Sequence, residues 1–217
     1  MKKFLVLVAV ALVAGPANAV WLELGPGNVG ITNWGWSVVG TVIDVGEVWG
    51  APGMGVLWIN ELESGLDYTF TKTVWNNTGV DWVAMELELL DPAGDQNDLD
   101  YDIPTSAWVP AGFSHSNDID GLSFAQGSGI PRTSGAFPSL VEDELAGKDF
   151  IGFYGGVVSG FGGIDAITFG LRDNDANQPF LLAQRPNVIA GEPIPEPTTM
   201  VLFGLGLAGV AIRRRRK

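Results

Sequence analysis

The chain has 217 residues, including 30 glycines and no cysteine, and its formal net charge is −13. This length fits one domain of ordinary size with targeting segments at its ends, and the glycine content predicts many turns. The lack of cysteine excludes disulfides, thiolate metal sites and cysteine nucleophiles. The only histidine is His115, which excludes a multi-histidine metal site.

Residues 1–19 have the composition of a secretory signal peptide. Lys2 and Lys3 precede an apolar run over residues 4–14, and the small residues Ala17 and Ala19 mark a cleavage site. A permanent signal anchor is the alternative, but the apolar run is shorter than the roughly 20 residues that a membrane-spanning helix needs. We therefore expect the export machinery and signal peptidase to act on the chain, and the mature protein to begin at Val20.

The charge of the body is strongly negative. Residues 20–192 contain 24 acidic and five basic residues. A surface of this sign repels phosphate backbones, so we expect no binding to nucleic acid.

Residues 20–184 are predicted to form one β domain. Short β-like runs separated by Gly, Asn, Asp and Pro fall at residues 36–45, 54–60, 67–75, 80–90, 122–126, 150–154, 166–171 and 179–183. Eight or nine such strands favour an antiparallel β-sandwich, jelly-roll-like in topology.

Two local predictions follow inside this domain. In the run 80–90, Val83, Met85, Leu87 and Leu89 alternate with Glu86 and Glu88, as in a half-buried strand. The Asn76–Gly79 turn predicts a hairpin between this run and the preceding one, with Gly79 at positive φ. Residues 139–146 are predicted to form a short helix, because Ser139 is a suitable cap with Glu142 three residues later.

Acidic loops offer a calcium hypothesis. Asp98, Asp100 and Asp102 alternate like the first ligands of a calcium loop, and Asp118 and Asp120 form a second short pattern. Both patterns lack the acidic residue at the twelfth position. The alternative is that Asp serves here as an ordinary turn former.

Eight tryptophans are the second feature with functional weight: Trp21, Trp34, Trp36, Trp49, Trp58, Trp75, Trp82 and Trp108. Trp34, Trp36 and Trp108 lie near predicted loops, where an exposed indole can stack on a sugar, so glycan binding is one hypothesis. The alternative is that the rings fill the core of the sandwich.

The sequence favours a protein that is not an enzyme, and no catalytic residue is assigned. His115 lies beside Ser114 and Ser116 and is expected in a loop rather than in a catalytic triad. A carboxylate pair for glycoside hydrolysis stays open, because 24 acidic residues offer many pairs. Asn76-Asn77-Thr78 also spells a glycosylation sequon.

The C-terminal segment has three parts. Residues 185–197 contain four prolines and are expected to form a linker, residues 198–212 carry no charge, and residues 213–217 are all basic. We expect a single transmembrane helix and basic tail over residues 198–217, with the cations on the cytoplasmic side. A buried core helix is the alternative.

Pro195, Glu196 and Pro197, the apolar helix and the cluster Arg213, Arg214, Arg215 and Arg216 together resemble the PEP-CTERM sorting signal of Gram-negative bacteria. The resemblance implies that an exosortase-type enzyme processes the chain near the Pro-Glu-Pro after a transient stay in the inner membrane. It also implies delivery to the cell surface or to the extracellular matrix of a biofilm.

The sequence thus predicts an exported, non-catalytic surface or matrix protein without a cofactor, apart from the calcium hypothesis. A glycan-binding module that contacts exopolysaccharide is the alternative function, and a glycoside hydrolase is the less favoured one.

Overall fold

The computed structural model describes residues 20–92, 109–116, 121–143, 148–174 and 179–188. Every regular element in these ranges is a β-strand, which confirms the prediction of a mostly β domain. The strands are β1 (Trp21–Leu24), β2 (Ile31–Val39), β3 (Val42–Trp49), β4 (Gly55–Asn60), β5 (Asp67–Asn76), β6 (Trp82–Pro92), β7 (Phe113–His115), β8 (Leu122–Ser123), β9 (Thr133–Ser134), β10 (Ser139–Asp143), β11 (Phe150–Val158), β12 (Gly163–Asp173) and β13 (Phe180–Val188).

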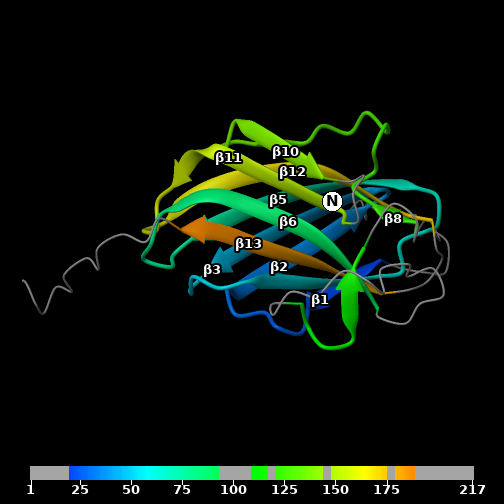
Figure 1. Cartoon of the computed structure of the whole chain (residues 1–217), viewed down its shortest axis with the longest axis horizontal. Helices are drawn as coiled ribbons and strands as arrows, with labels where there is room; N and C mark the ends of the chain where they lie inside the picture. Colours follow the sequence, from blue (N-terminus) through cyan, green and yellow to red (C-terminus); the bar gives the residue numbers. More distant parts are fainter. Residues whose placement is uncertain (1–19, 93–108, 117–120, 144–147, 175–178, 189–217) are drawn as a thin grey trace, which may run out of the picture.

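The strands form two sheets (Figure 1). Sheet A has the order β1-β4-β13-β6-β11-β10, with β7 paired to β6, and sheet B has the order β2-β3-β5-β12-β8, with β9 paired to β12. All pairs described are antiparallel except β3 with β5, which run parallel. Sheet B is therefore mixed, and the fold differs here from the all-antiparallel jelly roll that the sequence favoured.

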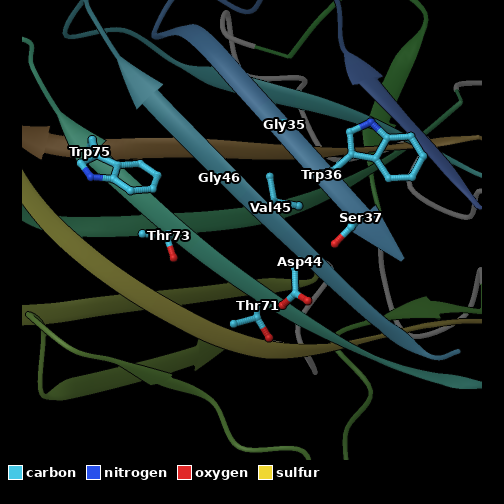
Figure 2. A pocket seen from close by; sticks show the side chains of 9 residues that line it. All are labelled: Gly35, Trp36, Ser37, Asp44, Val45, Gly46, Thr71, Thr73 and Trp75. Carbon is cyan, nitrogen blue, oxygen red and sulfur yellow. The ribbon is translucent and has the colours of Figure 1, made fainter. Parts of the chain in front are cut away.

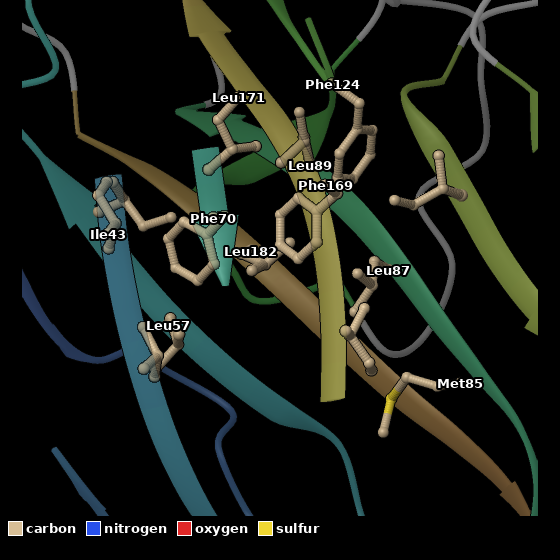
Figure 3. Packing of buried hydrophobic residues seen from close by; sticks show 14 of the residues in the cluster. Ile43, Leu57, Phe70, Met85, Leu87, Leu89, Phe124, Phe169, Leu171 and Leu182 are labelled. Carbon is tan, nitrogen blue, oxygen red and sulfur yellow. The ribbon is translucent and has the colours of Figure 1, made fainter. Parts of the chain in front are cut away.

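The two sheets pack against each other around one apolar core. Alternate residues of the strands point inward: Met85, Leu87 and Leu89 from β6 belong to the same buried cluster as Phe70 from β5 and Phe169 from β12 (Figure 3). The rings of Phe70 and Phe169 stack with centroids 5.0 Å apart. The inward face of β6 is thus the one that the alternation predicted, apart from Val83, which lies at a register shift between Trp82 and Ala84.

The predicted hairpin is wrong. The turn after Asn76 carries the chain from β5 in sheet B to β6 in sheet A, so the two strands do not pair. Gly79 does have positive φ, at 81°. The buried Asn76 side chain holds the crossing, because its amide nitrogen donates to the carbonyls of Val80 and Val158 at 2.9 and 3.1 Å. The amide of the sequon is therefore part of the fold, and its burial keeps it from serving as a glycan acceptor.

Three other segments differ from their predictions. Residues 139–143 form strand β10 instead of a helix, since pairing with β11 outweighs the local capping pattern. The run 36–45 is not one strand but parts of β2 and β3, joined by a turn at Gly40. Strand β13 continues to Val188, four residues into the expected linker. Pro186 fits there because β13 has lost its neighbour β4 beyond Gln184, and proline is tolerated at such an edge.

Candidate functional site

A shallow groove of about 330 Å³ lies on sheet B, along β2, β3 and β5. Strand register sets its lining, because residues opposite each other on neighbouring strands share a face. Gly35, Gly46 and Thr73 form one row across the three strands, and Ser37, Asp44 and Thr71 form the next. Trp75 lies on the same outward face as Thr71 and Thr73. Trp36 lies opposite the buried Val45, so its side chain leaves the edge strand β2 toward the other face of the sheet (Figure 2).

Gly35 and Gly46 leave the floor of the groove free of side chains. A Cβ at Gly35 would have no atom within 4 Å, and one at Gly46 would meet the Trp75 ring at 3.4 Å. The indole of Trp75 therefore lies against the backbone of β3 at Gly46, where a larger side chain would displace it.

The lining combines apolar and polar groups in the way that a carbohydrate site needs. The C–H face of a sugar ring packs on an indole, and sugar hydroxyls exchange hydrogen bonds with carboxylates and hydroxyls. The groove offers the indole of Trp75 together with the carboxylate of Asp44 and the hydroxyls of Ser37, Thr71 and Thr73. Asp44 is the acidic residue among those that line it.

The predicted stacking tryptophans have different positions. Trp36 is 39% exposed at the edge of sheet B, in the inward-facing row of Val45. Trp34 is partly buried against the core, and Trp108 lies outside the described residues. Sequence reasoning missed Trp75. The signal was present in β5, where Thr69, Thr71 and Thr73 alternate with buried residues and place Trp75 on the same outward face.

A polar cluster lies on the outer face of sheet A. His115 Nδ1 is 2.5 Å from Glu88 Oε1, and Arg185 donates to Glu88 Oε2 at 2.8 Å. Glu86 accepts from Tyr154 at 3.0 Å and lies 3.6 Å from Arg185 Nε. Burial and the hydrogen bond to Glu86 raise the pKa of Tyr154 to about 12.

This cluster corrects two expectations. His115 belongs to strand β7 and is buried, so it is not a loop residue, and Glu88 is 1% exposed, so β6 is buried on both faces there. The reason is that β7 pairs with β6, while Phe113 joins Leu90 and Leu181 in a second, smaller apolar cluster. The described contacts of Glu86 and Glu88 fasten β7, β11 and β13 to β6.

The calcium residues Asp98, Asp100, Asp102, Asp118 and Asp120 lie outside the described residues. Within the described ranges no group of three or more metal-ligating side chains comes together.

The predicted targeting residues also lie outside the described residues: Ala17 and Ala19 at one end, and Pro195, Glu196, Pro197 and Arg213 to Arg216 at the other. In the ranges that the structure covers, no helix is long and apolar enough to span a bilayer. The tail is instead characterised by comparison with known families, where the model of the PEP-CTERM protein-sorting motif matches residues 193–216.

The chain carries a PEP-CTERM sorting motif.

The match includes the Pro-Glu-Pro tripeptide, the uncharged segment and the four arginines, as the sequence predicted. The PEP-CTERM motif implies a secreted or cell-surface protein and processing by an exosortase-type enzyme. Searches of curated proteins and of solved structures gave no significant match for the chain.

Proposed function

We propose that this PEP-CTERM protein is a non-catalytic component of the cell surface or extracellular matrix. The sorting motif at residues 193–216 carries the proposal, because such a motif implies a secreted or cell-surface protein. The N-terminal segment directs export, and the apolar tail with its arginines holds the chain in the inner membrane until an exosortase-type enzyme acts near Pro195-Glu196-Pro197.

Replacing Arg213, Arg214, Arg215 and Arg216 by serine in the native host tests this mechanism. We expect the serine variant to lose membrane retention and processing, while a matched variant with four lysines keeps the charge and therefore the retention. Cell fractionation and immunoblotting follow both species. Normal retention and sorting of the serine variant would contradict the proposal.

A second candidate function is polysaccharide binding by the groove on sheet B. The observation that favours it is the Trp75 indole beside a floor made by Gly35 and Gly46, with Asp44 and three hydroxyls on the same face. A matrix protein meets polysaccharide as a repeating ligand, so many weak contacts add up through avidity.

Titrating the purified mature protein with host exopolysaccharide, while following tryptophan fluorescence, tests the binding. We expect Trp75→Ala to weaken it by about 5- to 30-fold, as for the loss of about 1–2 kcal/mol of stacking. Trp21→Ala is the control, because it also removes an accessible indole, 38% exposed, but from β1 in sheet A. Equal affinities for the two variants would contradict a site at this groove, and release of reducing sugar would point to a hydrolase instead.

A further inference from the structure

Three polar side chains lie together inside the sandwich core. Lys72 comes from β5 and Glu47 from β3, both in sheet B, and Gln184 comes from β13 in sheet A. All three are 0% exposed. We call them the Lys72 cluster. It is the place where a charged pair from one sheet meets an amide from the other.

The contacts within the Lys72 cluster have a definite arrangement. Glu47 Oε1 accepts from Lys72 Nζ and from the amide nitrogen of Gln184, each at 2.9 Å. Lys72 Nζ also donates to the amide oxygen of Gln184. The amine thus faces the amide carbonyl, while the carboxylate touches both the amine and the amide nitrogen.

The surroundings keep this arrangement fixed and dry. Trp49 Nε1 donates to the second oxygen of Glu47 at 3.1 Å, and the Trp49 and Trp82 rings meet edge to face with centroids 5.2 Å apart. Burial lowers the pKa of Lys72, although the neighbouring Glu47 opposes this effect. Desolvation is what turns a lysine into a usable nucleophile, because the neutral amine carries the reactive lone pair.

We propose that Lys72 and Gln184 join through an intramolecular isopeptide bond, with Glu47 carrying protons between the amine and the leaving amide nitrogen. The three requirements of such a reaction are present: an amine against a carboxamide, a carboxyl group within hydrogen-bond reach of both nitrogens, and exclusion of the water that would hydrolyse the intermediate.

The reaction balances without an oxidant or a cofactor. Lys72 gives one proton to Glu47, and the neutral amine attacks Cδ of Gln184 to form a tetrahedral intermediate. Glu47 returns the proton to the amide nitrogen, the old C–N bond breaks and ammonia leaves as the carbonyl re-forms. The extra proton on the new amide passes through Glu47 to the ammonia. One C–N bond forms, one breaks, and the chain loses one ammonia, about 17 Da.

The isopeptide bond supplies a covalent cross-link between the two sheets, which a chain without cysteine cannot obtain from a disulfide. The sequence contains no cysteine, so no disulfide can cross-link the sandwich. An amide between β5 and β13 ties sheet B to sheet A at the centre of the core.

Mass spectrometry of a tryptic digest of the full mature protein tests the proposal. If Lys72 is acylated, trypsin does not cleave after it, and the peptide that spans it stays linked to the peptide that begins at Asp173 and contains Gln184. The linked species is lighter than the sum of the two peptides by one ammonia. Lys148 is an internal control. Its Nζ lies over the Phe150 ring, which offers no carbonyl carbon for the amine to attack, so we expect complete cleavage after Lys148.

Two variants separate the roles. We expect Glu47→Gln to leave the peptides unlinked and Lys72 cleavable, and Gln184→Met to do the same while leaving the ion pair of Lys72 and Glu47 in place. Cleavage after Lys72 and separate peptides in the wild-type digest would overturn the proposal, whether or not either variant folds. Linked peptides in Glu47→Gln at the wild-type level would overturn the assignment of Glu47 as proton carrier.

Discussion

Replacing Gln184 by methionine isolates the energetic effect of the proposed link between the sheets. Methionine has similar length and no carbonyl for Lys72 to attack, and the salt bridge between Lys72 Nζ and Glu47 stays available at 2.9 Å. The change therefore removes the electrophile without leaving a buried charge alone, which by itself costs about 3–5 kcal/mol.

The expected loss follows from the size of the closed loop. A link between residues 72 and 184 closes a loop of about 110 residues, and the loop-entropy relation used for disulfides gives about 5 kcal/mol for it. Unfolding free energies of natural domains are about 5–15 kcal/mol, so this is a large fraction. For a domain of this size it corresponds to a fall in Tm of about 10–20 °C.

Urea denaturation of the wild type and of Gln184→Met, followed by tryptophan fluorescence, measures the difference. The variant is also expected to unfold with a steeper dependence on urea, because an unlinked unfolded chain exposes more surface. Without the bond, the substitution removes only the hydrogen bonds of one buried amide, about 1–3 kcal/mol. A loss of that smaller size with an unchanged urea slope would refute the reasoning.

Three further predictions test the core, the groove and the polar cluster. Phe169→Ala should cost about 3–5 kcal/mol in urea denaturation, because the buried ring stacks on Phe70 and meets Phe124 edge to face; a loss below 1 kcal/mol would argue against this core. Gly35→Leu should abolish polysaccharide binding, yet change stability by less than about 0.5 kcal/mol, since nothing lies within 4 Å of the new Cβ; retained affinity would place binding elsewhere. The fold raises the pKa of Tyr154 from 10.0 to about 12, so its protonated form contributes stability that is complete below pH 10 and is lost as the pH rises to 12. Denaturation midpoints of Tyr154→Phe should therefore fall less over that interval than those of the wild type, and parallel curves would exclude this contribution.

Local patterns in the sequence predicted strands better than strand partners. The alternation in β6 correctly placed Met85, Leu87 and Leu89 toward the core, because side-chain period is a local property. The turn at Gly79 gave no sign of whether the chain returns to the same sheet or crosses to the other. Buried hydrogen bonds of Asn76 to Val80 and Val158 decide that point, and Val158 is 82 positions away.

The functional residues show the same contrast between what a local sequence pattern predicts and what depends on long-range packing. Trp75 was recoverable from the alternation of threonines in β5, and Lys72 was recoverable as a charge on its apolar face, between Phe70 and Val74. The meeting of Lys72 with Gln184 was not, because it depends on how the two sheets pack. The sorting motif needed no fold, since a linear pattern at residues 193–216 defines it.

The intact mass of the mature protein from its native host tests the central claim of export and sorting most directly, because one spectrum reports both ends of the chain. The account predicts a chain from Val20 to a residue near Pro197, lighter by one ammonia, with any attached glycan added. A mass that still includes the segment to Lys217 would contradict processing at the motif, and one that still includes residues 1–19 would contradict signal-peptide cleavage.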